Sequence, residues 1–190
     1  MNLPNLLTII RMALVPVFIV FFYLGQGGAR IFCVMALVVF VFASITDAID
    51  GYIARKRGLI TNFGKLMDPL ADKVLTTAAF IVFVDMHIIP AWMVVVILAR
   101  EFAITGLRGV AASEGVVIAA DFSGKLKTVF QMVAICVILL AYAVSIAPMA
   151  EAAFDFIFGA GIVLMWVAVA LTVYSGIEYL WKGRKLLNLK

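Results

Sequence analysis

Six apolar segments, each about as long as a membrane-crossing helix requires, constrain this chain more than any other feature. A helix needs about 20 apolar residues to cross about 30 Å of hydrocarbon. The six segments cover residues 8–25, 31–53, 69–88, 89–110, 126–148 and 154–181. Because they lack the alternation of membrane-barrel strands, the sequence predicts an all-α, polytopic integral membrane protein with six transmembrane helices.

The composition excludes the common soluble classes. Of the 190 residues, 66% are hydrophobic and 14% are charged, whereas soluble domains are roughly 45–50% apolar and about 25% charged. A globule of this size has no core that could hold the surplus. A secreted disulfide scaffold, a disordered chain and an ordinary cytosolic enzyme are therefore excluded, and we expect a single membrane domain over residues 1–190.

The basic residues predict the orientation of the helices. With six spans, all but one of the 15 Lys and Arg residues fall on one side, and the exception is Arg30. Loops rich in Lys and Arg are typically cytoplasmic, so both termini are predicted to be cytoplasmic. These loops also account for the formal net charge of +4, and no nucleic-acid partner is expected.

Four aspartates gather at the predicted cytoplasmic ends of the second and third helices. Asp47 and Asp50 are three residues apart, and Asp68 and Asp72 are four apart, so each pair lies on one helical face. Carboxylates this close repel one another and are costly near hydrocarbon unless they are neutralised. Oxygen ligands favour hard cations such as Mg²⁺, Mn²⁺ or Ca²⁺, and two such ions suit phosphoryl chemistry.

The four aspartates could also have roles other than metal binding. Acidic residues at a helix end are often simply solvated, and Asp68, which precedes Pro69, could cap a helix. A membrane ion or proton transporter is the alternative from another functional class. Its acidic residues would be spread at depth along several helices, and an inverted repeat with broken helices would accompany them. The sequence shows neither feature.

The aspartates belong to a longer pattern, Asp47-x2-Asp50-Gly51-x2-Ala54-Arg55-x8-Gly64-x3-Asp68-x3-Asp72. This pattern resembles in full the signature of the CDP-alcohol phosphotransferase family, integral membrane enzymes of phospholipid synthesis. The segment Pro4–Arg11 is similar to the N-terminal segment of that family. The block Arg100–Arg108, together with Gly124–Thr128, resembles the phosphatidylglycerophosphate synthase branch of the family.

The resemblance implies a role for each matching residue. Two divalent cations, Mg²⁺ or Mn²⁺, would be ligated by Asp47, Asp50, Asp68 and Asp72, and Asp72 would also be the general base. The CDP moiety would be held by Asn5, Gly51, Arg55 and Thr61. Glycine lets a nucleotide approach the helix backbone, and arginine can meet a pyrophosphate oxygen with two hydrogen bonds.

The acceptor phosphate needs a cationic pocket, for which the candidates are Arg100, Arg108, Lys125 and Lys127. Their alternative role is to set the membrane topology or to contact anionic headgroups. Arg100 interrupts an apolar run, so it is expected to pair with Glu101 or with a ligand.

The reaction implied by the resemblance transfers the phosphatidyl group of CDP-diacylglycerol to glycerol 3-phosphate, giving phosphatidylglycerol phosphate and CMP. Inositol phosphate, serine and choline-type alcohols stay open as other acceptors, because the metal motif is shared across the family. The resemblance also implies a homodimer in the bacterial cytoplasmic (inner) membrane, with the active site facing the cytoplasm.

Overall fold

The described part of the chain forms six helices and no strand. A computed structural model describes residues 3–57, 62–113, 122–145 and 151–187, and describes side chains for Leu6 and residues 8–46, 73–113, 122–145 and 151–181. Its helices are α1 (Leu3–Gln26), α2 (Ile31–Arg57), α3 (Asn62–Asp85), α4 (Ala91–Ser113), α5 (Phe122–Val144) and α6 (Glu151–Leu187). The predicted all-α class is confirmed for these residues.

The helix ends differ from the predicted apolar segments. α2 continues to Arg57 and α6 to Leu187, and α3 begins at Asn62 instead of residue 69. Hydropathy marks only the apolar part of a helix, whereas backbone hydrogen bonds carry the helix on into polar sequence. The suggestion that Asp68 caps a helix before Pro69 is therefore wrong, because both residues lie inside α3.

Two short turns separate helices that follow closely in the sequence. Between α1 and α2, Gly28 adopts a φ of 110°, which suits a residue without a Cβ. Between α3 and α4, His87 has a φ of 57°, and the Ile88 amide donates to the Phe83 carbonyl at 2.8 Å. This arrangement closes the end of α3 and reverses the chain before α4.

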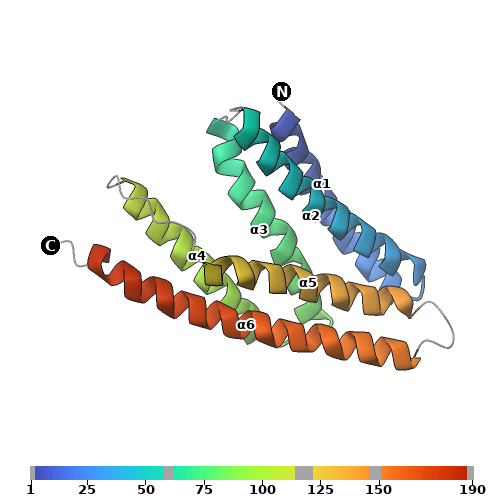
Figure 1. Ribbon diagram of the computed structural model, residues 1–190. Coiled ribbons are helices and arrows are strands. Elements are labelled where there is room, and N and C mark those ends of the chain that lie inside the picture. The colour runs from blue at the N-terminus through green and yellow to red at the C-terminus, as the bar shows by residue number, and fades with distance from the viewer. Residues whose placement is uncertain (1–2, 58–61, 114–121, 146–150, 188–190) are drawn as a thin grey trace.

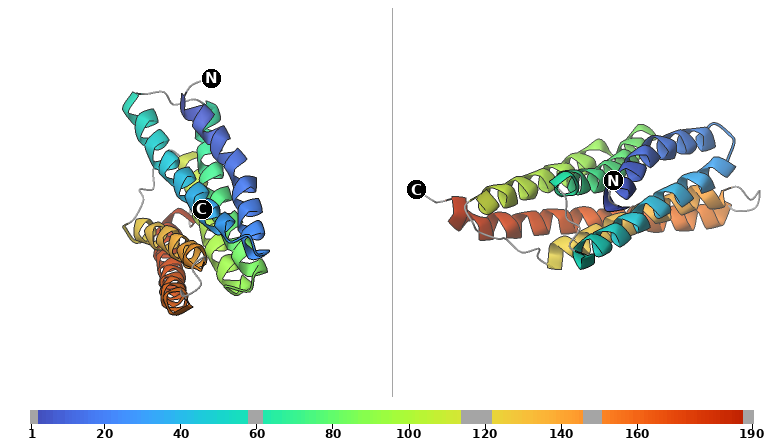
Figure 2. Two further views of the ribbon diagram at one scale, coloured as in Figure 1. Left: turned by 90° about the vertical axis from the view of Figure 1, so that its right-hand side faces the viewer. Right: turned by 90° about the horizontal axis from the view of Figure 1, so that it is seen from above.

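The helices pack as two antiparallel pairs that a third contact joins. α1 packs along α2 and α5 packs along α6, while α2 also contacts α5 (Figures 1 and 2). α3 packs on α1, and α4 packs on α6. Aromatic rings fill the core: the fully buried Phe22 ring lies 6.1 Å from that of Phe83 and 5.5 Å from that of Tyr142, centroid to centroid. The Phe22 ring thereby links α1 to both α3 and α5.

The helix ends that the sequence assigns to one side gather in the structure. In Figure 1 the start of α1, the end of α2 and the start of α3 lie at the top, and the ends of α4 and α6 lie at the left. The α1–α2, α3–α4 and α5–α6 connections lie toward the lower right. The bundle therefore has two distinct ends, and the helical segments that carry the aspartates belong to the first.

Three described helical segments are long and apolar enough to cross a membrane: Thr8–Gln26, Phe122–Val144 and Glu151–Trp181. A shorter apolar stretch covers Ile31–Thr46 of α2. α4 carries Arg100 and Glu101 at its middle and Arg108 in its second half, and these charges interrupt its apolar sequence. The same three residues belong to the cluster of charged side chains described below.

Close packing of α5 on α6 depends on Gly161. A Cβ added there would lie 2.7 Å from Ile138 Cγ1 and 3.2 Å from the Ile138 amide nitrogen. Gly161→Ala is therefore expected to push the two helices apart and to lower stability by about 1–3 kcal/mol. The midpoint of thermal unfolding in detergent measures this effect.

Gly159→Ala is the matched control on the same helix, because a Cβ at Gly159 would meet no described atom within 4 Å. Equal unfolding midpoints for the two variants would contradict the proposed role of Gly161 in the packing of α5 on α6.

Candidate active site

The residues predicted to bind metal and nucleotide lie on adjoining helix ends. Asp47, Asp50, Gly51 and Arg55 are on the last turns of α2, and Asp68 and Asp72 are in the first half of α3. Only residues 58–61 separate the two helices, whose ends are neighbours in Figure 1. Asn5 is on the first turn of α1. The side chains of these residues, and Thr61 altogether, lie outside the described part of the chain.

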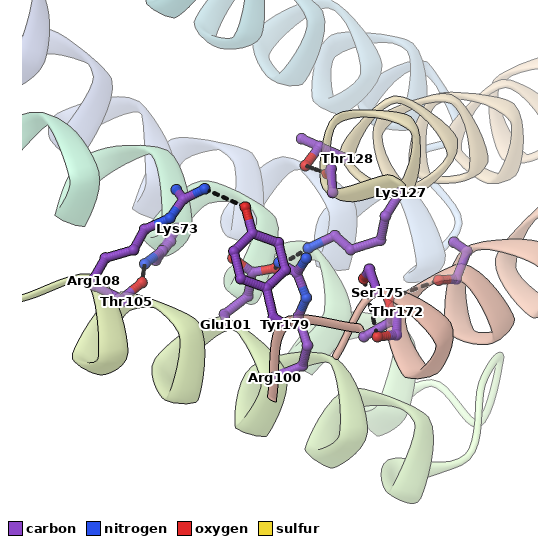
Figure 3. A network of polar contacts seen from close by, with 12 residues as sticks. Lys73, Arg100, Glu101, Thr105, Arg108, Lys127, Thr128, Thr172, Ser175 and Tyr179 are labelled. Atoms are coloured by element: carbon purple, nitrogen blue, oxygen red, sulfur yellow. Dashed lines mark hydrogen bonds and ion pairs between the residues drawn. The ribbon is translucent and has the colours of Figure 1, made fainter. Parts of the chain in front are cut away.

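The structure brings three of the predicted acceptor residues together. Arg100 of α4 and Lys127 of α5 contact Glu101, and Tyr179 of α6 lies between Arg100 and Arg108 (Figure 3). We call this group, completed by Lys73 and Thr105, the basic cluster. The fourth predicted residue, Lys125, is exposed on α5.

Glu101 holds two of the cations. Its Oε1 accepts hydrogen bonds from Lys127 Nζ and from Arg100 Nη1, the latter at 3.4 Å. The Lys127 side chain is only 2% exposed, and a lysine so buried is costly unless it is paired. The expected pairing of Arg100 with Glu101 is confirmed. The structure adds that Lys127 shares the same carboxylate.

Tyr179 contacts both arginines. The centre of its ring lies 5.6 Å from Arg100 Cζ and 5.3 Å from Arg108 Cζ, within the range of cation–π attraction. Its hydroxyl oxygen accepts a hydrogen bond from Arg108 Nη2 at 2.6 Å. Sequence analysis missed Tyr179, which follows an apolar stretch of α6 with no motif to mark it.

The two arginines keep donors that the described residues do not use. The Nε atoms of Arg100 and Arg108 are buried, and neither has a hydrogen-bond partner among the described residues. Buried donors are nearly always paired in native proteins. Among the described residues, these N–H groups are therefore unsatisfied donors within the basic cluster.

Lys73 ties the aspartate-bearing helix to the basic cluster. Its Nζ donates to Thr105 Oγ1 of α4 at 2.6 Å (Figure 3), and Lys73 directly follows Asp72 in the sequence. The turn of α3 that includes residue 72 is thus anchored near α4. The helix that carries Asp72 is therefore held beside the helix that carries Arg100 and Arg108.

An apolar groove runs between α2 and α5. It has a volume of about 450 Å³, and its lining includes Leu37 and Ile45 of α2 together with Val133 and Leu140 of α5. Ile45 lies two residues before Asp47. The groove therefore leads along the bundle toward the aspartate-bearing end of α2, and its chemistry suits a hydrocarbon chain.

A larger cavity, of about 690 Å³, lies at the opposite end of the bundle. Arg30, Tyr142 and Glu151 contribute to its lining, and Arg30 Nη1 donates to the Ser145 carbonyl there. None of the predicted site residues lines this cavity. This cavity is therefore separate from the helix ends that carry the predicted site residues.

These features define a helical bundle with membrane-spanning segments and a cluster of cationic side chains on α4 and α5 around Glu101 and Tyr179. The chain belongs to the CDP-alcohol phosphatidyltransferase family, whose model matches residues 1–174. This confirms the resemblance inferred from the aspartate motif.

Individual relatives match nearly the whole chain. It is 42% identical to the CDP-diacylglycerol–glycerol-3-phosphate 3-phosphatidyltransferase of Bacillus subtilis, over 98% of this chain and 99% of that protein. A protein of the same name from Rickettsia typhi is 38% identical over 94% of each chain. A probable phosphatidylglycerophosphate synthase of Mycobacterium tuberculosis is 39% identical, over 94% of this chain and 79% of that protein.

Proposed function

We propose that this chain transfers the phosphatidyl group of CDP-diacylglycerol to glycerol 3-phosphate, giving phosphatidylglycerol phosphate and CMP. The names of its relatives support this assignment. The observation that carries it is the basic cluster, in which Arg100 and Arg108 keep buried donors and which is tied through Lys73 to the helix that bears Asp72. Glycerol 3-phosphate offers the two groups such a site requires, a phosphate and a nucleophilic hydroxyl.

The proposed topology has six spans in one domain over residues 1–190, in the bacterial inner membrane. Both termini and the active site face the cytoplasm. The distribution of basic residues supports this orientation, as does the gathering of the corresponding helix ends in Figure 1.

We assign two divalent cations, Mg²⁺ or Mn²⁺, to Asp47, Asp50, Asp68 and Asp72. Two pairs of carboxylates, three and four residues apart on adjoining helix ends, form an all-oxygen donor set that fits hard cations. When bound, the ions would neutralise charge on the diphosphate of the lipid substrate. Asn5, Gly51, Arg55 and Thr61 would hold the CDP moiety.

The chemical step needs one base. Asp72 would accept the proton of the acceptor hydroxyl. The hydroxyl oxygen then forms a bond to the phosphorus that carries diacylglycerol, and the bond from this phosphorus to the CMP oxygen breaks. Arg55 would hold the departing CMP phosphate, and Arg100 and Arg108 would hold the acceptor phosphate away from the bond that breaks.

The basic cluster favours a phosphorylated acceptor over serine or a choline-type alcohol. Those alcohols lack a phosphate and would leave buried arginine donors unpaired. Lys127 contributes mainly by pairing with Glu101, whereas exposed Lys125 would guide the anion toward the arginines. Inositol phosphate also carries a phosphate, so experiment decides whether it can serve as the acceptor.

Two further proposals concern the lipid and the oligomer. One acyl chain of CDP-diacylglycerol would lie in the apolar groove between α2 and α5. The second is a homodimer, which the family resemblance implies.

Release of CMP by the purified protein tests the proposed function. CMP should appear only when CDP-diacylglycerol, glycerol 3-phosphate and Mg²⁺ or Mn²⁺ are all present, and a chelator should stop it. Serine in place of glycerol 3-phosphate should give little CMP, and the same assay with inositol phosphate decides between the two phosphorylated acceptors. Solute flux without CMP release, independent of metal, would instead support the transporter.

Arg108→Ala is expected to raise the KM for glycerol 3-phosphate roughly ten- to a hundred-fold, because a charge-assisted hydrogen bond contributes about 1.5–3 kcal/mol. Lys125→Ala should raise it less, since its side chain is exposed. The KM for CDP-diacylglycerol should change little in both variants. Arg30→Ala, at the opposite end of the bundle, is the control. Unchanged KM values in both site variants would discard the proposed pocket.

A further inference from the structure

Tyr179 lies between the two arginines that are proposed to bind the acceptor. We propose that Tyr179 is a positioning residue, which holds Arg100 and Arg108 side by side so that one phosphate can bind both. This inference rests on the proposed function and adds to it a residue of α6, a helix that carries no motif of the site.

The tyrosine ring offsets the repulsion between the two guanidinium groups. Both Cζ atoms lie within 6 Å of the ring centre, where the negative face of an aromatic ring attracts a cation. The hydroxyl adds a hydrogen bond from Arg108. Because the whole residue is only 3% exposed, water competes little with these contacts.

A neutral partner has a specific advantage here. Glu101 also binds Arg100, but its carboxylate cancels positive charge, and it pairs with Lys127 as well. Tyrosine restrains two cations without adding a negative charge, so the site keeps its attraction for a dianion. This separates the two roles: Glu101 neutralises a buried lysine, and Tyr179 arranges the arginines.

The path of Arg100 leaves it little freedom. A Cβ added at Gly124 of α5 would lie 3.1 Å from Arg100 Nη2, and one added at Gly176 of α6 would lie 3.3 Å from Arg100 Cγ. The side chain of Arg100 therefore passes close to both helices before it reaches the ring of Tyr179 (Figure 3). Its Nε is buried and has no hydrogen-bond partner among the described residues.

Two substitutions at position 179 test the proposal. Tyr179→Leu removes the ring and the hydroxyl, and it should raise the KM for glycerol 3-phosphate about tenfold or more. Tyr179→Phe keeps the ring and should raise it only about two- to fivefold. In both variants kcat and the KM for CDP-diacylglycerol should stay within about twofold of the parent, since no reacting group has moved. Tyr174→Leu, an exposed tyrosine on the same helix, should leave all three constants unchanged.

A second measurement does not depend on turnover. Sodium phosphate at constant ionic strength should raise the unfolding midpoint of the parent and of Tyr174→Leu. This increase should be reduced in Tyr179→Phe and absent in Tyr179→Leu.

Several outcomes would overturn the proposal. One is an unchanged KM for glycerol 3-phosphate in both Tyr179 variants, and another is a fall in kcat with no change in that KM. If Tyr179→Leu does not fold, an unchanged KM in Tyr179→Phe is sufficient. Arg100→Ala and Arg108→Ala distinguish a failure of the proposed acceptor site from a failure of the positioning role of Tyr179. If these two variants also leave the KM for glycerol 3-phosphate unchanged, the acceptor site itself is wrong. If they raise it while the Tyr179 variants do not, only the positioning role fails.

Discussion

Asp72→Asn is expected to reduce kcat by about 10²–10⁴-fold or more, because it removes the proposed general base. Asparagine has nearly the same shape as aspartate but cannot accept the proton of the acceptor hydroxyl. CDP-diacylglycerol should still bind, since Arg55 and the other three aspartates remain. CMP release measures turnover, and equilibrium binding of the lipid to protein in nanodiscs measures affinity.

Asp85→Asn is the matched control for Asp72→Asn. Asp85 is an exposed residue at the other end of α3, where it accepts a hydrogen bond from the Tyr23 hydroxyl at 2.7 Å. Its replacement should leave kcat near the parental value. Parental turnover in Asp72→Asn would show that the base lies elsewhere.

Asp47→Asn and Asp68→Asn are expected to abolish activity at ordinary Mg²⁺ concentrations. Each substitution removes one charge and one anionic ligand from a site that we assign four carboxylates, and affinity for divalent ions depends on ligand charge. Raising Mg²⁺ or Mn²⁺ should restore part of the activity, so CMP release is measured across a metal titration.

Asp155→Asn serves as the control for these two variants, because Asp155 is exposed near the start of α6, at the opposite end of the bundle. Its metal dependence should match that of the parent. Full activity of Asp47→Asn or Asp68→Asn at low Mg²⁺ would remove the two-metal proposal.

The fold was predictable wherever apolar residues mark the helices. The six segments were predictable because each is long and predominantly apolar, and breaks such as Gly27–Gly28 and Pro90 are strong local signals. The polar ends were not predictable in this way. α3 runs for seven residues before Pro69, in sequence that hydropathy assigns to a loop.

The candidate site was predictable where it depends on local spacing. Arg100 and Glu101 are adjacent in the sequence, so their pairing was expected. By contrast, Tyr179 is 71 residues from Arg108, and no local pattern encodes a contact between helices so far apart in the chain. Lys127 shows a second difficulty, because the sequence does not reveal whether a buried cation binds a ligand or an internal carboxylate.

The length of α6 determines where the soluble substrate meets the protein. Its 37 residues extend about 55 Å, against a hydrocarbon thickness of about 30 Å. Even a steep tilt of about 40° leaves roughly 40 Å along the bilayer normal, so α6 must project into the headgroup layer. Tyr179 is 28 residues beyond Glu151, close to the end of the Glu151–Trp181 span. We therefore expect the arginines to lie near the boundary of the hydrocarbon, where a water-soluble acceptor meets them from the aqueous side and the lipid substrate from the bilayer.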